Sequence, residues 1–269
     1  MNNEKDILIK TEIMHNLPIF YNEIEIFNTI DSTNDYIKKI AATKKEGFVC
    51  ISNEQLKGRG RNGRSFFSPK EKGIYMSILI KPDIPISDFL KITACTSVAI
   101  FDALKKNYGL EISIKWINDI YYQNTKIGGI LCESEIKANT NIVDYMVIGI
   151  GLNIHKTNFT EELINTASSI ENYSEHEEKR NNIINDILTY FYKYYHEIQT
   201  FSFLPTYKKH SLVLHSNITV YEHNISYPAY VEDIDQYANL VIRKEDGSLK
   251  ILNSGEISIR KINESKTKV

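Results

Sequence analysis

The sequence predicts an α/β fold followed by a small antiparallel β-barrel. In residues 20–214, apolar strand patterns alternate with amphipathic helix patterns, whereas residues 217–261 hold only short alternating segments. A chain of 269 residues has room for one large domain and a small one. We therefore expect a larger domain over residues 1–213, a barrel over residues 214–262 and a disordered tail over residues 263–269.

Apolar runs predict the strands of the larger domain. Ile74 to Ile80 is apolar at nearly every position, the pattern of a strand buried on both faces. Gly149 and Gly151 lie inside another apolar run, where glycine marks either the close approach of a ligand or backbone, or tight sheet packing. The expected strands cover residues 21–27, 48–53, 74–80, 112–116, 120–122, 126–133 and 143–154.

Helix signals lie between these runs. Asp31 to Asn34 offers several N-cap residues before a short helix, and Ser87 is an N-cap for a long helix that ends at Tyr108, before Gly109. Residues 155–169 lose periodicity and become polar, which predicts a flexible loop. Two further helices are expected at residues 177–199 and 203–214.

The C-terminal part predicts about five short strands. Asn, Asp-Gly and Ser-Gly separate alternating segments, as in a small antiparallel barrel. These segments are residues 218–220, 229–234, 240–242, 249–252 and 257–259.

Charge and cysteine content exclude some classes of function. The net charge is −2, from 32 basic and 34 acidic residues, so any binding site for a polyanion must be local. The three cysteines have neither metal nor disulfide spacing and lie in apolar patterns, which predicts buried thiols and a cytoplasmic location. The N-terminus does not resemble a signal peptide, and no run approaches a membrane span.

One stretch concentrates cations on a pliant backbone: Gly58-Arg59-Gly60-Arg61-Asn62-Gly63-Arg64. Glycine permits backbone N–H groups to turn together toward an anion, and arginine adds a planar fork of donors that suits phosphate or carboxylate. Phe66 and Phe67 follow and are positioned to close over a ligand. We expect this stretch to become ordered around an anionic ligand.

Two familiar phosphate motifs do not fit this stretch. Gly58, Gly60 and Gly63 spell G-x-G-x-x-G, but no helix begins inside the motif, as a dinucleotide fingerprint requires. A Walker A loop is excluded because no Gly-Lys-Ser/Thr ends the run. Taken alone, the stretch is equally consistent with a solvated surface loop or a nucleic-acid patch.

Three other polar positions have both a structural and a functional interpretation. Ser32, Thr33 and Asn34 are either a helix cap or part of a binding site. Lys115 ends an apolar strand beside the single tryptophan, so it is either a surface lysine or a buried cation that binds an anion. Asn153 ends a glycine-containing strand, where it pairs either with a ligand or with the backbone.

Together these residues resemble the biotin–protein ligases, also called biotin–acetyl-CoA-carboxylase ligases. The similarity follows the family's order over residues 25–260, which makes it far more specific than any single motif. The matching blocks are Asp31-Ser32-Thr33-Asn34, Glu54-Gln55 with Gly58 to Arg64 and Ser68-Pro69, Lys115-Trp116-x-Asn118-Asp119, Lys126-Ile127-Gly128-Gly129 with Glu133, Gly149-x-Gly151-x-Asn153, and Gly255-Glu256-Ile257-Ser258.

The resemblance implies a class II synthetase-like mixed sheet flanked by helices, with a small SH3-like C-terminal β-barrel. It assigns the reaction to Lys115, Arg61 and Arg59, without identifying metal ligands. The implied biotin-binding residues are Ser32, Thr33, Asn34, Gln55, Gly58, Arg59, Gly60, Arg61, Lys115 and Gly128. The implied ATP-binding residues are Arg61, Arg64, Phe66, Lys115, Asn118 and Asn153.

The implied activity is ATP-dependent: biotin is activated as biotinyl-5′-AMP with Mg²⁺ and then transferred to a lysine of a biotin carboxyl carrier domain. We expect a monomer or weak homodimer that binds neither DNA nor membrane, because the chain starts almost at the catalytic part. Ile117 and Phe66 replace the proline and tryptophan common in the family. The alternatives are a lipoate–protein ligase, whose Arg-Arg-x-Ser-Gly-Gly-Gly block is missing, and a non-catalytic nucleic-acid-binding module.

Overall fold

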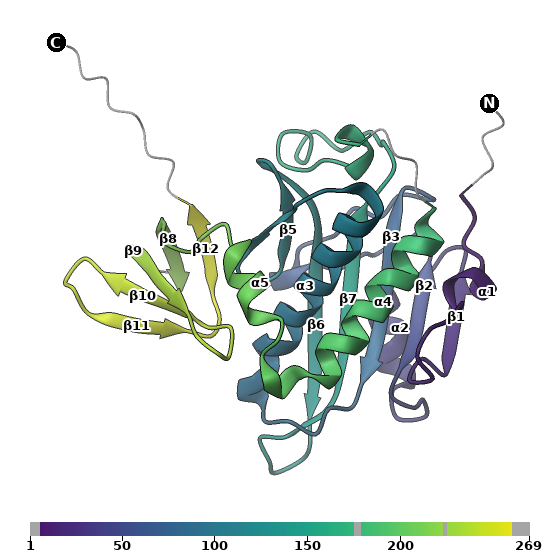
Figure 1. Cartoon of the computed structure of the whole chain (residues 1–269), viewed down its shortest axis with the longest axis horizontal. Helices are drawn as coiled ribbons and strands as arrows, with labels where there is room; N and C mark the ends of the chain where they lie inside the picture. Colours follow the sequence, from purple (N-terminus) through teal and green to yellow (C-terminus); the bar gives the residue numbers. More distant parts are fainter. Residues whose placement is uncertain (1–5, 175–178, 223–224, 260–269) are drawn as a thin grey trace.

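A seven-stranded mixed sheet forms the larger part of the protein (Figure 1). In the computed structural model, which describes residues 6–174, 179–222 and 225–259, the strand order is β1-β2-β3-β7-β6-β5-β4. Only β1 and β2 are parallel within this sheet. The strands are β1 (Glu23–Phe27), β2 (Phe48–Ser52), β3 (Gly73–Ile80), β4 (Ser113–Lys115), β5 (Asp119–Tyr122), β6 (Thr125–Ile136) and β7 (Val143–Asn153).

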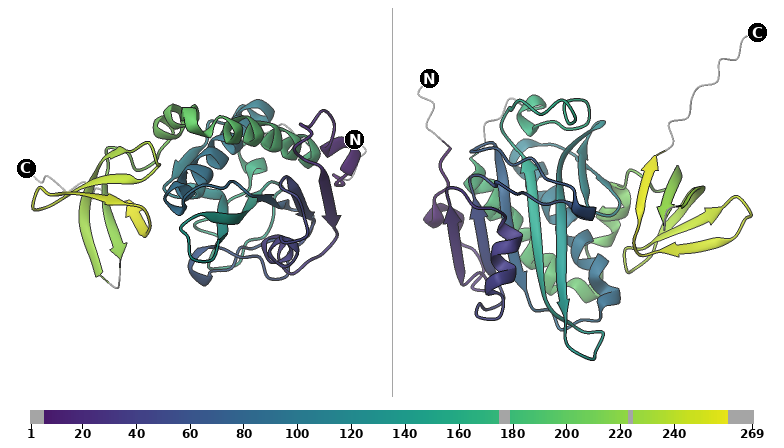
Figure 2. Two further views of the ribbon diagram at one scale, coloured as in Figure 1. Left: turned by 90° about the horizontal axis from the view of Figure 1, so that it is seen from below. Right: turned by 180° about the vertical axis from the view of Figure 1, so that it is seen from behind.

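Helices cover both faces of this sheet. The long helices α3 (Phe89–Tyr108) and α4 (Arg180–His196) lie on one face, and α2 (Thr33–Ile40) lies on the other (Figure 2). Strand β2 is buried at every position, so its alternate side chains enter two different cores. Two short helices, α1 (Lys10–Ile13) and α5 (Leu204–Lys209), pack at the ends of the long helices.

The expected strands and helices of the larger domain are confirmed, with local differences. The helix expected at residues 203–214 is shorter, since α5 covers only Leu204–Lys209. Ser32 caps α2, because its Oγ accepts from the backbone N–H of Asp35 at 3.4 Å. Gly109 ends α3 in the left-handed region with a φ of 67°. Ser87 is not the cap of α3: its hydroxyl donates to Asp88, and a 3₁₀ turn at Ile86–Asp88 precedes the helix.

The five short strands expected at the C-terminus are also confirmed. They form one antiparallel sheet in the order β11-β10-β9-β8-β12 (Figure 1). Their bounds are β8 (Asn217–Glu222), β9 (Ile225–Ile234), β10 (Leu240–Lys244), β11 (Leu249–Leu252) and β12 (Glu256–Ile259). The tail expected at residues 263–269 lies outside the described residues, and the exact boundary between the two domains stays a prediction.

The C-terminal sheet is fastened to the turn between β4 and β5. The indole Nε1 of Trp116 donates to the carbonyl oxygen of Ala238 at 2.9 Å, and Trp116 is buried. The hydroxyl of Tyr207 donates to the carbonyl of Ile117 at 3.3 Å. The first contact holds the strand end that carries Lys115 next to the second sheet, and the second holds it next to α5 (Leu204–Lys209).

The three cysteines are free thiols. Cys50 and Cys95 are buried as expected, whereas Cys132 is only partly buried because it faces a cavity next to the second sheet. No helix in the described part of the chain is both long enough and apolar enough to cross a membrane.

A buried ionic cluster ties the N-terminal segment to α4 and to the end of β7. The Nε of Arg180, whose side chain is fully buried, lies 2.9 Å from Oδ2 of Asp6. The same carboxylate contacts Nε2 of His155 at 2.7 Å, and Nδ1 of His155 contacts Glu171. Burial alone raises the pKa of Asp6, but hydrogen bonds with His155 and Arg180 outweigh it and hold the pKa below its ordinary value.

Replacing Asp6 by Asn tests this cluster, because it removes a counter-charge from a fully buried guanidinium. We expect Asp6→Asn to lower the free energy of unfolding in urea by about 3–5 kcal/mol. Asp83→Asn is the matched control: its exposed carboxylate pairs with Lys137 at the surface and contributes about 1 kcal/mol or less. Equal, small losses of unfolding free energy in the two variants would show that Asp6 does not stabilise the buried Arg180.

The same cluster predicts a pH dependence of stability. Because the pKa of Asp6 is lowered in the folded state, its contribution is present at neutral pH and is lost as the pH falls through that pKa. Burial lowers the pKa of His155, but hydrogen bonds with Asp6 and Glu171 outweigh it and raise the pKa. The contribution of His155 is therefore present below its ordinary pKa and lost as the pH rises through the raised value.

Candidate active site

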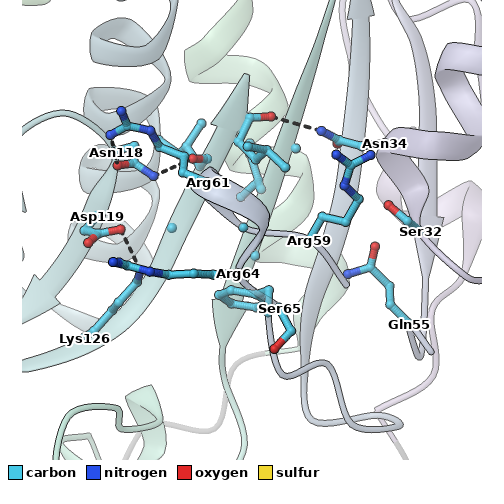
Figure 3. Close-up of a pocket in the computed structure, with 18 of the residues that line it drawn as sticks. Ser32, Asn34, Gln55, Arg59, Arg61, Arg64, Ser65, Asn118, Asp119 and Lys126 are labelled. Carbon is cyan, nitrogen blue, oxygen red and sulfur yellow. Dashed lines mark hydrogen bonds and ion pairs between the residues drawn. The ribbon is translucent and has the colours of Figure 1, made fainter. Parts of the chain in front are cut away.

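A cavity of 330 Å³ opens between α2, the Gly/Arg loop (residues 58–69) and the central strands (Figure 3). It brings together side chains from segments far apart in the chain. Of the residues predicted from the sequence, those that line it are Ser32, Thr33, Asn34, Gln55, Arg59, Gly60, Arg61, Arg64, Phe66, Lys115 and Asn118.

Neutral hydroxyl and amide groups occupy the end of the cavity at α2. Oε1 of Gln55 accepts from the backbone N–H of Thr33 at 3.0 Å. The hydroxyl of Ser77 lies 2.7 Å from Oγ1 of Thr33 and 2.6 Å from Oδ1 of Asn34. Such a network holds donors and acceptors in fixed directions, so this end suits an uncharged ligand group that has both N–H and C=O.

Two glycines of β7 allow side chains to lie directly on the strand. A Cβ at Gly149 would come within 2.3 Å of Oδ1 of Asn34, and one at Gly151 within 2.5 Å of the ring of Phe66. The sequence left open whether these glycines mark tight packing or the approach of another group. The structure shows the approach of side chains that line the cavity.

The arginines of the Gly/Arg loop are paired with anionic and polar groups of the protein. Nη1 of Arg59 lies 2.6 Å from Oδ1 of Asp35, and Nη2 lies 3.4 Å from Glu133. Nη2 of Arg64 lies 3.0 Å from the carboxylate of Glu256. Arg61 donates to Oδ1 of Asn118 and to the carbonyl of Gly255, both at 3.3 Å.

These ion pairs stabilise the charged form of Asp35. Burial raises the pKa of Asp35, but hydrogen bonds from Lys38 and Arg59 outweigh it, and the pKa lies below its ordinary value. The carboxylate therefore stays ionised at neutral pH and competes with a ligand for Arg59.

Unlike Arg59 and Arg64, Lys115 has no carboxylate within ion-pair distance among the described residues. Its Nζ lies 5.9 Å from the centre of the Tyr121 ring, and its side chain is partly buried at the end of β4. An unpaired cation beside a cavity is available to bind an anionic ligand. The sequence left this open, and the placement favours the functional interpretation.

Three predicted residues do not line the cavity. A Cβ at Gly58 would lie 2.4 Å from the carbonyl oxygen of Phe66, and one at Gly128 would lie 2.5 Å from Leu152, so both glycines permit close packing. Asn153 is buried, and its Nδ2 donates to the carbonyl of Ser168 at 3.1 Å. The ligand-binding roles of these three residues stay predictions.

The sequence analysis gave no role to several charged residues at the site. Lys126 lines the cavity and forms an ion pair with Asp119 at 2.6 Å (Figure 3). Glu256 also lines it, although it belongs to β12 of the second sheet. Lys126 and Asp119 could have been predicted as site residues, because both are charged and both lie inside the matching motif blocks. No local pattern indicated that Glu256 would contact Arg64, from which 192 residues separate it.

No group of three or more His, Cys, Asp or Glu residues within the described ranges is arranged to hold a metal ion. The acidic residues near the cavity, Asp119 and Glu256, are each paired with a basic side chain. The described residues therefore do not form a protein cage for a divalent cation.

The sheet, its helices and this cavity define an α/β domain with a cation-lined cavity and an appended antiparallel sheet. The family model described as "Biotin/lipoate A/B protein ligase family" matches residues 26–153. These residues include the hydroxyl and amide groups at the α2 end of the cavity and the glycine-containing strands β6 and β7. Residues 26–153, just under half of the chain, are similar to this family.

Curated relatives agree with this assignment. The chain is 29% identical to the bifunctional ligase/repressor BirA of Bacillus spizizenii over 252 residues, covering 91% of this chain and 75% of the relative. It is 32% identical to biotin–protein ligase 2 of Arabidopsis thaliana over 177 residues, covering 57% of this chain and 52% of the relative.

Solved structures share the fold. The biotin protein ligase from Aquifex aeolicus in complex with biotin and ATP superposes with a TM-score of 0.75 at 23% identity, covering 89% of this chain and 99% of that one. The biotin protein ligase from Leishmania major in complex with biotinyl-5-AMP has a TM-score of 0.60 at 23% identity, covering 86% and 99%. The expected class II synthetase-like architecture with a C-terminal β domain is thus confirmed.

Gly151→Ala tests the seat of Phe66 on β7. The added Cβ forces the ring of Phe66 away from the strand. If the packing of the Gly/Arg loop loses about 1 kcal/mol, the population of molecules with an open loop rises about fivefold. We expect trypsin to cleave within the Gly/Arg loop correspondingly faster. Gly129→Ala is the matched control, because Gly129 pairs with Gly151 across the sheet and its Cβ would keep ordinary contacts of 3.5 Å. Unchanged cleavage in Gly151→Ala would show that Phe66 does not hold the loop.

Proposed function

We propose that the protein is an ATP-dependent ligase that activates biotin as biotinyl-5′-AMP and transfers it to a lysine of a biotin carboxyl carrier protein. One observation carries the proposal: a single cavity combines a neutral hydroxyl and amide end with a cationic end. Biotin has the same division, with an uncharged ureido ring system at one end and a carboxylate at the other.

The neutral end of the cavity matches the ureido group. A ureido group has one C=O acceptor and two N–H donors, and the hydroxyl and amide groups of Ser32, Thr33 and Gln55 supply both kinds of partner. Because the backbone N–H of Thr33 and the hydroxyl of Ser77 fix these side chains, little entropy is lost when the ring binds.

The cationic end suits the activation step. A carboxylate oxygen of biotin attacks the α-phosphorus of ATP and forms a bond to it. The bond from the α-phosphorus to the bridging oxygen breaks, and pyrophosphate leaves with the electron pair of that bond. Lys115, Arg59 and Arg61 offset the negative charge that gathers there, with Arg64, Asn118 and Phe66 on the nucleotide side. Each such contact is worth about 3 kcal/mol of transition-state stabilisation.

The Gly/Arg loop protects the product of this step. A mixed anhydride hydrolyses when water reaches it, so an enzyme that makes one must exclude water. Phe66, seated on Gly151, anchors the loop over the cavity, and the loop arginines move from internal carboxylates to the ligand. No protein nucleophile is needed for either half-reaction.

In the second half-reaction a lysine amine of the carrier attacks the acyl carbon, and AMP leaves. Mg²⁺ is expected to arrive with the phosphates of ATP, since the described residues form no metal cage of their own. A monomer or weak homodimer and a reducing, cytoplasmic setting remain expectations. Neither lipoate as the acid nor a nucleic acid as the ligand is favoured by a specific contact.

The test is ATP–pyrophosphate exchange with the purified protein. We expect exchange that requires biotin, together with a rise in melting temperature when biotin and ATP are added. Exchange that depends on lipoate and not on biotin would contradict the proposal.

Lys115→Ala provides the variant for the same assay. We expect exchange to fall by about two orders of magnitude, because about 3 kcal/mol of charge stabilisation is lost, while the unfolding curve stays close to that of the wild type. Lys105→Ala removes a surface lysine that pairs with Glu111 and is expected to keep full exchange. Near-normal exchange in Lys115→Ala would disprove the role given to this residue.

A further inference from the structure

We propose that a second cavity, between α3 and the C-terminal sheet, is the passage through which the lysine of the carrier reaches the adenylate. This inference rests on the proposed function. The cavity has a volume of 880 Å³ and lies against the loop before α3, the first turn of that helix, β11 of the C-terminal sheet and the loop between β9 and β10.

The second cavity is next to the first. Arg61, Asn118 and Ile130 line both, so these three residues form the partition between them. Arg61 lies across this partition and is held only by two long hydrogen bonds of 3.3 Å, to Asn118 and Gly255. When Arg61 turns to the phosphates of a bound ligand, the two cavities come into direct contact.

Closure of the Gly/Arg loop makes a second approach necessary. The loop lines the first cavity from Arg59 to Phe66 and covers it when closed, which excludes water from the mixed anhydride. The attacking amine must arrive while the adenylate is still covered. A route through the partition satisfies both requirements, because it leaves the loop in place.

The walls of the second cavity fit a lysine side chain. Phe89, Leu90, Ile117 and Ile251 give it an apolar lining along which four methylene groups can lie. One of its lining residues, Asn239, has a buried side-chain oxygen with no hydrogen-bond partner in the described structure. An entering amine supplies the donor that this oxygen lacks.

The charges around the second cavity favour a neutral amine. Its one acidic lining residue, Asp88, is paired with the buried Lys91 at 2.6 Å and so is not free to hold an ammonium. Burial raises the pKa of Cys132 to about 12, so this lining thiol is uncharged. An apolar wall with the cation of Arg61 at its inner end lowers the pKa of an entering lysine, and only the neutral amine is a nucleophile.

The transfer step is balanced with these groups alone. The lysine gives up its ammonium proton to water as it enters, and the amine nitrogen bonds to the acyl carbon of the adenylate. The bond from that carbon to the phosphate oxygen breaks, AMP leaves with the electron pair, and the phosphate of the departing AMP accepts the second proton from the new amide nitrogen.

The outer rim of the second cavity offers a surface for the domain that carries the lysine. Ile251 on β11 is 61% exposed and Tyr237 is 38% exposed, and both line the cavity. Exposed apolar side chains at the mouth of a passage are typical of a contact with a protein partner. The carrier domain is therefore expected to touch β11 as its lysine enters.

Two bulky substitutions at the rim test the passage. Ile251→Trp and Ser87→Trp place a large ring at the mouth, at exposed positions that do not disturb a core. We expect biotin-dependent ATP–pyrophosphate exchange to stay at the wild-type level, while single-turnover transfer from preformed adenylate to a purified biotin carboxyl carrier domain slows by about tenfold or more.

Leu249→Trp is the matched control, because Leu249 is 60% exposed on the same strand, two residues away, and does not line the second cavity. We expect it to transfer biotin at the wild-type rate. Unchanged transfer in both rim variants would overturn the passage and place the amine at the mouth of the first cavity. An equal loss in Leu249→Trp would also overturn it. Absence of exchange in the wild type would instead refute the proposed ligase activity.

Discussion

The site depends on the pairing of loop arginines with the protein's own carboxylates. Arg59 contacts Asp35 and Glu133, and Arg64 contacts Glu256, so the cationic loop is ordered by charges that come from α2, β6 and β12. These side chains are partly exposed, and ion pairs of this kind contribute about 0–1 kcal/mol each. Such contacts hold the loop near the cavity but yield to a ligand with several negative charges.

The sheet and its glycines determine where those charges meet. Strand β7 runs through the middle of the sheet, and its two glycines let Asn34 and Phe66, which both line the cavity, lie against the strand. The C-terminal sheet completes the site, because Trp116 fastens it next to Lys115 and its residue Glu256 reaches the loop. The second sheet therefore contributes residues to the site.

Local patterns were enough to predict the strands and the family. Apolar runs such as Ile74 to Ile80 are buried from end to end, and Ser32 caps its helix as its residue type predicts. Contacts between distant segments were not predictable. Glu256 meets Arg64 across 192 residues, and Asp6 meets Arg180 across 174. A sequence read along its length shows which residues carry charge but not which of them face one another.

The same limit explains the residues whose place differed from their predicted role. Gly58, Gly128 and Asn153 belong to matching motif blocks but do not line the cavity, and their ligand-binding roles stay predictions. The second cavity had no sequence signal, since its walls come from α3, β6, β11 and the loop between β9 and β10.

The central claim is that the Gly/Arg loop leaves its internal carboxylates and closes over the ligand. Hydrogen–deuterium exchange of residues 57–70, measured with and without biotin and ATP, tests this claim most directly. The account predicts slower exchange throughout this segment when both ligands are bound, with little change in α4 on the opposite face of the sheet. Equal exchange of the segment in the free and bound protein would contradict it.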